Sequence, residues 1–400
     1  MKVQCENCFG VNAVDEADLG EYLQCGHCGE AFLVPNERFA PGVVIDDYII
    51  EKKIGQGGMG VVFRALQISL DRYVALKILA LENQSQDAVI DFVREARASA
   101  KLHHQNIVQA YAVGQADGGV YYLAMELVDG QTLKEILDVE KKIAVDTALN
   151  ITKQVSEALS YAWAQQKLVH RDIKPDNIMV VSDMAKLMDL GLSRFANDKL
   201  ASTDDDDSIM GTPQYISPEQ LIGSEMDFRG DIYSLGATLY HFITGEFAFG
   251  GASVTEIARK HLQEPLRPAH EHDSSIPPQV SKLIEKMMEK QPEDRFQSME
   301  LLSKEIDKVR KAISTNTTST KKGLHLRTSS SRRRSAEGGR KAHRPVPGEA
   351  AARGGRGGGV AISESELKQF TDVSGHGKLK AMSMICMILT VALALVLLVI

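Results

Sequence analysis

The first third of the chain carries short apolar runs of the kind that form β-strands. Val, Ile, Leu and Tyr recur in these runs, and glycines or polar residues separate them. Between the last two runs, residues 88–102 place apolar side chains at helical spacing, which predicts a helix there. We expect a small lobe built mainly from strands over residues 48–54, 61–65, 72–79 and 120–127.

From residue 133 onward, the hydrophobic pattern becomes that of amphipathic helices. One apolar stripe, at three- and four-residue intervals, consists of Ala148, Ile151, Val155, Leu159 and Ala162. Strands followed by helices indicate an α+β fold with a small β-rich lobe and a larger α-helical lobe. We assign this two-lobed domain to residues 48–312.

Composition separates this domain from the C-terminal part of the chain. The chain has 400 residues, of which 44% are hydrophobic and 25% charged, so most of it can bury a core. Residues 313–378, in contrast, are rich in Ser, Thr, Gly and Arg and poor in large apolar side chains. Such a segment has little to offset chain entropy, so we predict a disordered linker there.

The C-terminal end has the composition of a membrane-spanning helix. Residues 381–400 carry no charge, and a helix of this length is about 30 Å long, which matches the hydrocarbon core of a bilayer. A buried core helix is the alternative, although such a helix normally keeps a polar face. Because Lys378 and Lys380 precede the segment and the N-terminus has no signal-peptide pattern, we expect a single-pass anchor in the cytoplasmic membrane, with the bulk of the chain in the cytoplasm.

A glycine-rich motif lies between the first two predicted strands. It contains G-x-G-x-x-G and consists of Ile54, Gly55, Gln56, Gly57, Gly58, Met59, Gly60, Val61 and Val62. This pattern alone is weak evidence, because dinucleotide-binding folds share it. In those folds a helix follows the glycines, whereas here a β-branched run follows. The context favours a strand–turn–strand flap whose backbone N–H groups cover the phosphates of ATP.

A lysine lies within the third predicted strand. Lys77 ends the sequence Val-Ala-Leu-Lys, and burying its amine is costly unless the amine meets an anion. The phosphates of ATP would provide that anion, and Glu95 on the following helix is the candidate carboxylate to hold the amine. Alternatively, Lys77 reaches solvent and Glu95 is an ordinary surface residue.

The strongest signal is the run from His170 to Asn177, followed by Asp189. Asp172 can accept the proton of a substrate hydroxyl, and Lys174 can neutralise a phosphoryl group in transfer. Asn177 and Asp189 offer hard oxygen ligands for Mg²⁺ or Mn²⁺. Chance rarely places these residue types in this order and at these spacings.

With these residues, the chain resembles the eukaryotic-type Ser/Thr protein kinases of bacteria over residues 48–310. The resemblance implies the two-lobed kinase fold and transfer of the ATP γ-phosphate to Ser or Thr hydroxyls of protein substrates, with autophosphorylation expected. The non-enzyme alternative is an ATP-binding pseudokinase scaffold that makes protein contacts through its N-terminal module. Such a scaffold would usually lack Lys77, Asp172 or Asp189.

The same resemblance assigns roles to further residues. It implies an adenine pocket and hinge formed by Ile54, Val62, Ala75, Met125, Glu126, Val128, Met179 and Met188. It also implies that Asp231 braces the catalytic loop and that Arg295 pairs with Glu219. Two positions depart from the family pattern, because Leu190 replaces a phenylalanine and Ser217 replaces an alanine. Neither change removes a catalytic group.

Hydroxyl side chains in the activation segment are candidate phosphorylation sites. The resemblance implies that Arg171 awaits a phosphate from this segment. Ser202, Thr203 and Ser208 flank an acidic run at residues 204–207. We expect phosphorylated Thr203 or Ser208, or in part the acidic run, to neutralise Arg171. Alternatively, the aspartates only keep the loop soluble.

Four of the five cysteines lie within the first 28 residues. Cys5 with Cys8 and Cys25 with Cys28 form two C-x-x-C knuckles, so four thiolates can surround one tetrahedral ion. The spacing resembles a zinc ribbon, and we predict structural Zn²⁺ in a module over residues 1–35. A redox pair is the alternative, although one C-x-x-C would suffice for it.

We find no repeat with a period of 20 to 50 residues.

The distribution of charge indicates further partners. The net charge is −7, yet residues 311–360 carry twelve basic residues against two acids, or +10. This basic linker is a candidate contact for anionic lipid, with acidic proteins or nucleic acid as alternatives and a solvated tether as the simplest interpretation. The module at 1–35 has one lysine against six acids, so nucleic acid is not expected there and protein contact is favoured. A homodimer is left open.

Overall fold

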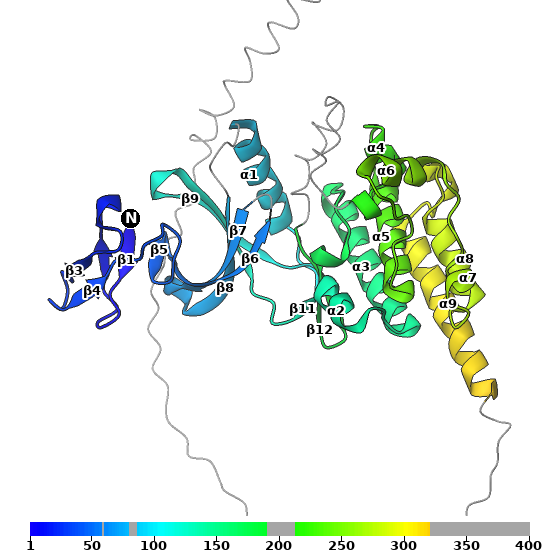
Figure 1. The fold of residues 1–400 in the computed structure, drawn as a ribbon, viewed down its shortest axis with the longest axis horizontal. Helices are drawn as coiled ribbons and strands as arrows, with labels where there is room; N and C mark the ends of the chain where they lie inside the picture. Colours follow the sequence, from blue (N-terminus) through cyan, green and yellow to red (C-terminus); the bar gives the residue numbers. More distant parts are fainter. Residues whose placement is uncertain (58–59, 80–85, 190–212, 321–400) are drawn as a thin grey trace, which may run out of the picture. The chain divides into compact units, whose positions relative to one another are not determined.

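The computed structural model describes residues 1–57, 60–79, 86–189 and 213–320 (Figure 1). Predictions for Gly58, Met59, the activation-segment hydroxyls, Leu190 and the segment 381–400 lie outside these residues. Within them, no helix is both long and apolar enough to cross a bilayer. The side chain of Glu95 is also outside the description, although its backbone belongs to helix α1.

Eight antiparallel strands form the main sheet in the order β2-β1-β5-β6-β7-β8-β10-β9. The strands are β1 (Lys2–Gln4), β2 (Val11–Ala13), β5 (Val43–Ile45), β6 (Tyr48–Gly57), β7 (Gly60–Gln67), β8 (Arg72–Leu79), β9 (Ala110–Ala116) and β10 (Val120–Glu126). The predicted strands correspond to β6, β7, β8 and β10, and the predicted helix to α1 (Gln86–Ala100), so these predictions are confirmed. Strands β1, β2, β5 and β9 of this sheet were not predicted.

The sheet of the strand-rich lobe curls strongly. The rings of Tyr48 on β6 and Tyr122 on β10 lie 5.4 Å apart in an edge-to-face contact, although two strands separate them in the sheet. The Tyr122 hydroxyl donates a hydrogen bond of 2.5 Å to Asp46 Oδ2 in the turn before β6. Burial of Phe63, Leu76 and other apolar side chains inside this curl forms the core of the lobe.

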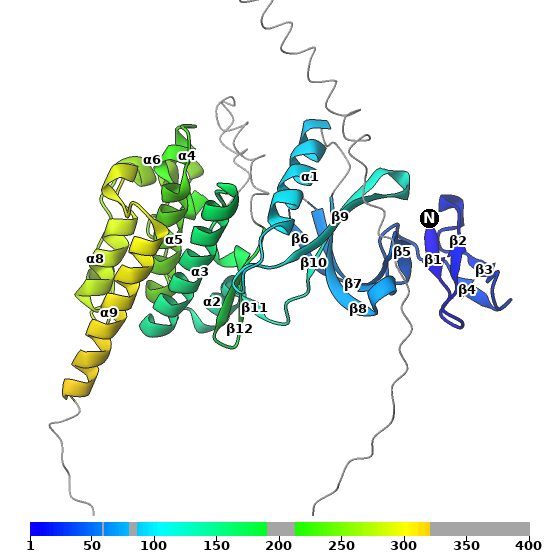
Figure 2. The same cartoon turned by 180° about the vertical axis from the view of Figure 1, so that it is seen from behind.

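The larger lobe is helical, as predicted (Figures 1 and 2). Its helices are α2 (Leu133–Glu140), α3 (Val145–Gln166), α4 (Pro218–Leu221), α5 (Phe228–Thr244), α6 (Val254–Gln263), α7 (Ala269–His272), α8 (Pro278–Met287) and α9 (Met299–Thr320), beside a small sheet of β11 (Gln131–Thr132), β12 (Ile178–Val181) and β13 (Met184–Leu187). The predicted apolar stripe of α3 is buried throughout. Helix α5 is buried on nearly all sides, which explains its apolar composition.

Helix α9 extends into the segment predicted to be linker. The linker was expected to begin at residue 313, but α9 continues to Thr320. Ile313 still packs against the core of the helical lobe, which favours continuation of the helix. The expected start of the linker was therefore wrong by at least eight residues.

The N-terminal module consists of two similar halves. The hairpin β1–β2 carries Cys5 and Cys8, and the hairpin of β3 (Tyr22–Gln24) and β4 (Ala31–Leu33) carries Cys25 and Cys28. In each half, the N–H of the first cysteine bonds at 2.9 Å to the carbonyl five residues later. Phe9 and Gly29, at equivalent positions, both have left-handed φ angles, of 62° and 78°.

A repeat with a 20-residue offset is therefore present, and the expectation of none was wrong. Beyond the cysteines, few side chains coincide, Gln4 with Gln24 and Val14 with Val34 among them. Backbone hydrogen bonds and φ angles carry the similarity, and these have little sequence signature.

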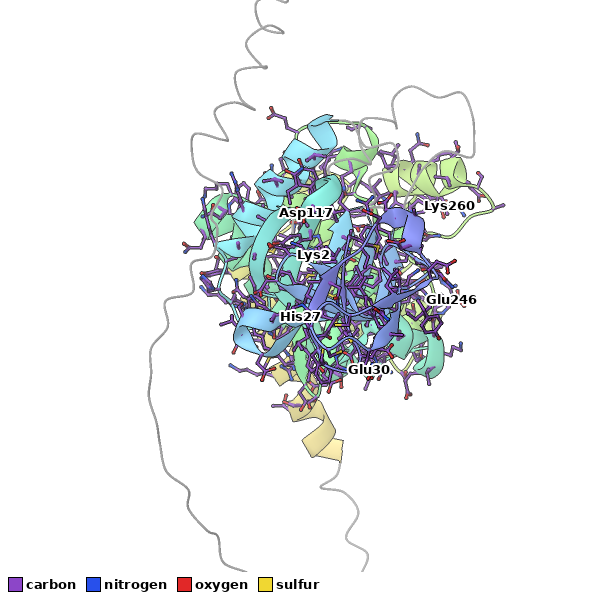
Figure 3. The ribbon with its side chains drawn as sticks, turned by 90° about the vertical axis from the view of Figure 1, so that its left-hand side faces the viewer. Lys2, His27, Glu30, Asp117, Glu246 and Lys260 are labelled. Carbon is purple, nitrogen blue, oxygen red and sulfur yellow. The ribbon has the colours of Figure 1, made fainter. Side chains whose placement is uncertain are left out.

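The module is joined to the strand-rich lobe by strand pairing. Strand β1 pairs with β5 in the register Lys2↔Val44 and Val3↔Val43. The N–H of Gln4 donates to the carbonyl of Gly42 at 2.9 Å. Lys2 Nζ also lies 3.3 Å from Asp117 Oδ2, and Figure 3 shows these two side chains as neighbours. Strand β5, which lies between the two predicted domains in the sequence, therefore pairs with β1 of the module and with β6 of the strand-rich lobe.

Candidate active site and metal centre

The glycine flap is the hairpin of β6 and β7, with Gly57 paired to Gly60. Gly60 has φ +153°, and a Cβ atom there would lie 2.1 Å from the carbonyl oxygen of Ile78. Only glycine therefore fits against β8 at this position. Ile54, Gln56 and the neighbouring part of the flap are solvent-exposed.

Several residues of the predicted nucleotide pocket share one face of the sheet. Val62 pairs with Lys77, and Met125 pairs with Ala75, in neighbouring strands. Side chains at directly paired positions, and at alternate positions of one strand, lie on the same face. The curled sheet therefore brings Val62, Ala75, Lys77 and Met125 together, although they come from three strands.

The hinge residue Glu126 is held by side-chain contacts. Its carboxylate lies 2.9 Å from Lys186 Nζ, and its N–H donates to the carbonyl of Gln109 at 2.8 Å. A contact from Glu126 to a base would therefore have to come from its backbone carbonyl. Val128 follows the strand at this point, and Met179 and Met188 lie on and just after the small sheet, all three half-buried.

A cavity of about 20 Å³ lies next to the predicted pocket. Of the predicted residues, Met125 and Asp189 line it, together with side chains that sequence reasoning missed, which are Ala96, Ser99, Val108, Ala110, Leu123 and Leu187. The volume suits about one water molecule and is far too small for a nucleotide. Ile54, Val62 and Met179 do not contribute to it.

Lys77 and Asp189 form a close ion pair. Lys77 Nζ lies 2.8 Å from Asp189 Oδ1, and the Lys77 side chain is buried. Sequence reasoning predicted an anion partner for this amine and named Glu95, but the carboxylate that the described residues provide is Asp189. The assignment of Glu95 stays a prediction, because its side chain is not described.

The environment of Asp189 favours its charged form. Burial alone would raise the pKa of this carboxyl, but the charge and hydrogen bond of Lys77 lower it below its usual range. Its φ of +53° lies in the left-handed region, which is costly for a residue with a Cβ atom. The fold thus holds an ionised carboxylate in a strained position beside the lysine.

Asp172, Lys174 and Asn177 converge on one carboxylate oxygen. Lys174 Nζ lies 2.7 Å from Asp172 Oδ2, and Asn177 Nδ2 donates to the same oxygen at 2.8 Å. Asn177 Nδ2 also donates to the Asp172 carbonyl at 2.8 Å. In the described part of the chain, Asp172 Oδ1 is thus left for a substrate hydroxyl. The Asn177 amide oxygen is left for a metal ion.

Asp231 fixes the backbone of the catalytic loop, as the resemblance implied. Its two carboxylate oxygens accept hydrogen bonds from the N–H groups of His170 and Arg171, at 2.8 and 2.9 Å. Burial raises the pKa of Asp231, while these bonds favour its charged form. Arg171 has φ +69°, so the loop needs this support to keep its shape.

Two residues to which sequence reasoning gave no role complete the loop. The ring of His170 contacts the Met188 carbonyl at 2.8 Å, which links the loop to the residue before Asp189. Gln220 Nε2 donates to the Arg171 carbonyl at 2.7 Å. His170 is the first residue of the predicted run, whereas Gln220 lies 49 positions from Arg171 and had no local signal.

The buried pair of Arg295 and Glu219 is present in the structure. Arg295 donates from Nη1 and Nη2 to the two Glu219 oxygens at 2.7 and 2.9 Å. It also donates to the carbonyls of Arg229, Glu289 and Lys290. With its donors satisfied, a fully buried guanidinium is tolerated.

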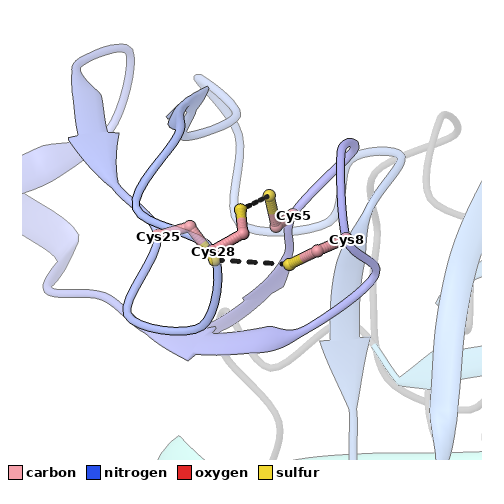
Figure 4. A group of neighbouring side chains, drawn as sticks. All are labelled: Cys5, Cys8, Cys25 and Cys28. Carbon is pink, nitrogen blue, oxygen red and sulfur yellow. Dashed lines mark hydrogen bonds between the residues drawn. The ribbon is translucent and has the colours of Figure 1, made fainter.

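The four N-terminal cysteines lie together (Figure 4). Their Sγ atoms are all within 4.8 Å of one another, with Cys5–Cys28 at 3.9 Å and Cys8–Cys25 at 3.6 Å. A tetrahedral zinc ion with Zn–S bonds of about 2.3 Å separates its sulfurs by about 3.8 Å. The cluster therefore fits a zinc ion.

Polar groups around Cys25 favour its thiolate form. Burial acts to raise its pKa, but hydrogen bonds from N–H groups, including those of His27 and Asn12, lower the pKa to about 6. The Asn12 amide also accepts from the N–H of Gly26 at 2.9 Å, which ties the second knuckle to the first half of the module. Asn12 is a further residue of the centre that sequence reasoning missed.

Comparisons with known proteins agree with this geometry. The family described as protein kinase domain matches residues 48–306. A probable serine/threonine-protein kinase of Clostridium acetobutylicum is 38% identical over 270 residues, which cover 67% of this chain and 40% of the relative. The serine/threonine-protein kinase pkn3 of Myxococcus xanthus is 40% identical over 278 residues, covering 66% of this chain and 50% of the relative. The chain thus spans half or less of the length of these relatives.

A solved structure is also similar. The crystal structure of the Mycobacterium tuberculosis PknI kinase domain has 25% sequence identity and a TM-score of 0.54. The match covers 67% of this chain and 98% of that one.

Proposed function

This chain belongs to the protein kinase family, and from that premise we propose that it transfers the γ-phosphate of ATP to serine and threonine hydroxyls of proteins, its own included. One observation carries the proposal. Asp172, Lys174 and Asn177 converge within 2.8 Å, and Lys77 pairs with Asp189. The identity to relatives named serine/threonine-protein kinases supports the choice of substrate hydroxyl.

The tasks of this reaction are divided among five residues. Asp172 Oδ1 accepts the proton of the attacking hydroxyl and directs its oxygen, while Oδ2 stays bonded to Asn177 and Lys174. Lys174 and Lys77 place positive charge beside the phosphates. Asn177 and Asp189 would hold Mg²⁺ or Mn²⁺, which when bound with ATP neutralises charge on the phosphate oxygens.

Phosphorylation by the purified full chain tests this proposal. With Mg²⁺ and γ-labelled ATP, we expect label on the chain and on a generic basic protein substrate. Asp172→Asn should reduce incorporation by about 10²–10⁴-fold, because it removes the proton acceptor. Asparagine has the same shape as aspartate, and its amide oxygen can still accept hydrogen bonds. The matched control is Asp183→Asn, an exposed carboxylate in the turn after β12, which should leave incorporation unchanged.

The scaffold alternative gives a different result. A pseudokinase would bind nucleotide without transferring phosphate, so the wild-type chain would show no incorporation with Mg²⁺ or Mn²⁺. Incorporation that Asp172→Asn leaves unchanged would indicate a contaminating kinase and would also contradict the proposal.

We further propose that the four cysteines hold structural zinc and that residues 381–400 anchor the chain in the cytoplasmic membrane, with the catalytic domain in the cytoplasm. The distances between the sulfurs support the first part. The composition of residues 381–400 supports the second, and the +10 charge of residues 311–360 would add contact with anionic lipid. Removing residues 381–400 should move the chain from the membrane fraction to the soluble fraction. If it fractionates with membranes regardless, the anchor lies elsewhere.

A further inference from the structure

The two halves of the N-terminal module present equivalent strand edges. In an antiparallel hairpin, alternate residues direct their N–H and C=O groups toward the partner strand and the others direct them outward. The N–H of Cys5 bonds to Gly10 within its hairpin, and the N–H of Cys25 bonds to Glu30 within its own. Lys2 and Gln4 therefore point outward from β1, and Tyr22 and Gln24 point outward from β3.

The two outward edges differ in their occupancy. The edge of β1 is filled, because Lys2 pairs with Val44 and the Gln4 N–H bonds to Gly42. The edge of β3 has no strand beside it among the described residues, since its sheet contains only β3 and β4. An edge with free N–H and C=O groups is a template for another strand. On the equivalent edge of β1, the contact is pairing with a strand.

The surroundings of the β3 edge are apolar and acidic. Tyr22 and Leu33 face each other across the hairpin and are 71% and 46% exposed. The module carries one lysine against six acids, Glu21 and Glu30 among them at the two ends of this hairpin. A strand with apolar residues and flanking positive charge matches this edge.

One segment of this chain has that pattern. Leu324 and Leu326 alternate with His325, and Lys321, Lys322 and Arg327 flank them. Six further basic residues follow up to residue 344. The strand on the equivalent edge, β5, is also three residues long, and all three of its residues are apolar.

The same chain cannot easily supply this segment to its own β3. Three residues separate Thr320, the end of α9, from Leu324, and they span at most about 14 Å. Helix α9 packs on α3 and α8 of the helical lobe. That lobe meets the sheet just before the start of β9, where the Val108 N–H bonds to the Leu187 carbonyl. The module lies at the other end of β9, where Lys2 contacts Asp117 in the turn to β10. A second copy of the chain has no such restriction.

We propose that the outward edge of β3 binds the basic segment 321–344 of a second copy of this chain, as an added strand centred on Leu324–Leu326. The contact links kinase chains head to tail, module to linker, and is independent of catalysis. Ser329, Ser330 and Ser331 lie beside the added strand in the sequence, so phosphate there would oppose binding to the acidic module.

Photo-cross-linking between two isotopic forms of the full chain tests the proposal. A ¹⁴N chain carrying Tyr22→p-benzoylphenylalanine is mixed with a ¹⁵N chain in detergent with zinc and without ATP. Mass spectrometry should find ¹⁴N–¹⁵N cross-links from position 22 to residues 321–344. The same probe at Val139, which is 74% exposed on α2, should not reach that segment.

A pair of substitutions separates backbone pairing from general proximity. Gln24→Pro removes the outward N–H of β3 without removing a hairpin bond, and should reduce the cross-link at least tenfold. Gln24→Ala keeps that N–H and should leave the yield unchanged. The zinc content of each variant shows whether the module is intact.

Changes in the added strand keep the proposal testable if Gln24→Pro loses zinc. Leu324→Asp with Leu326→Asp, in the ¹⁵N chain only, leaves the module unaltered and should also reduce the cross-link at least tenfold. Cross-links confined to ¹⁴N–¹⁴N pairs, cross-links to other segments, or a yield that these changes do not alter would overturn the proposal.

Discussion

Lys77 Nζ lies 2.8 Å from Asp189 Oδ1, which joins strand β8 of the small lobe to the segment that follows β13 in the large lobe. The two residues are 112 positions apart in the sequence. Their pairing holds a buried amine and an ionised carboxylate at the junction of the two lobes. In the proposed reaction, these two groups would contact the nucleotide and its metal ion.

Replacing Lys77 should remove activity and alter acid stability. We expect Lys77→Met to reduce phosphate incorporation at least about 100-fold, because it removes a cation from the phosphate site. The pKa of Asp189 is held below its usual value, so the pair stabilises the fold above about pH 4 and ceases to do so as the pH falls through the lowered pKa. Kinase assays at pH 7 and thermal unfolding at pH 7 and at about pH 2, below the usual pKa of an aspartate, check this. Lys53→Met, at an exposed lysine on β6, is the control and should change neither measurement.

The Arg295–Glu219 pair should be costly to break from either side. Arg295→Met leaves the buried Glu219 carboxylate without its cationic partner. Glu219→Gln leaves the buried Arg295 guanidinium without its anionic partner. We expect each single change to destabilise the fold by about 3–5 kcal/mol in urea unfolding. The double change Arg295→Met with Glu219→Gln should cost less than the sum of the two single changes. Additive losses would show that the pair is not energetically coupled.

Gly60 and Gly57 are paired in the flap, but a Cβ atom would meet different surroundings at the two positions. An alanine at Gly60 would place Cβ 2.1 Å from the Ile78 carbonyl oxygen, whereas a Cβ at Gly57 meets nothing within 4 Å. Gly60→Ala should therefore lower stability by about 1–3 kcal/mol, and Gly57→Ala should change it far less. Thermal unfolding of both variants measures the difference. Equal losses would mean that the contact with β8 does not restrict position 60.

A buried histidine should make stability depend on pH. His261 is fully buried and bonds to the Tyr233 hydroxyl at 2.9 Å, and burial followed by the charge of Lys290 lowers its pKa to about 3. Between pH 6.5 and 3 the unfolded chain binds a proton that the folded chain does not, so stability falls as the pH falls. The loss from this group at pH 5 is about 2 kcal/mol.

His261→Gln should flatten this dependence. Unfolding free energies at pH 7 and pH 5 would show a smaller decrease for His261→Gln than for the wild type. His103→Gln, at an exposed histidine, serves as the control and should keep the wild-type slope. A slope that is the same in all three proteins would exclude His261 as its source.

Removing zinc should loosen the edge of the kinase sheet. Strand β1 ends one residue before Cys5 and pairs with β5, so the metal centre and the lobe share a strand. We expect one zinc per chain, and we expect Cys25→Ser to lose it and to increase amide hydrogen exchange in Val43–Ile45. Cys386→Ser, at the remaining cysteine, is the control. Full protection of β5 in a zinc-free chain would show that the pairing does not need the metal.

The residues that carry phosphate chemistry could be read from the sequence because that chemistry requires particular side chains close together along the chain. Asp172, Lys174 and Asn177 lie within six residues, and the structure brings them to one oxygen. Strands and helices with regular apolar spacing, such as β8 and α3, were also predictable, because burial of one face is a local property of the pattern.

Contacts between distant residues were decided only by the tertiary structure. The pairing of Lys77 with Asp189, the bond from Gln220 to Arg171 and the joining of β1 to β5 all depend on how the chain curls and packs. The similarity of the two cysteine hairpins was also hidden, although their cysteines were plain to see. Backbone hydrogen bonds are compatible with almost any side chain, so the sequence gives little sign of which strand edges are paired. The edge of β1 is paired with β5, whereas the edge of β3 has no neighbouring strand among the described residues.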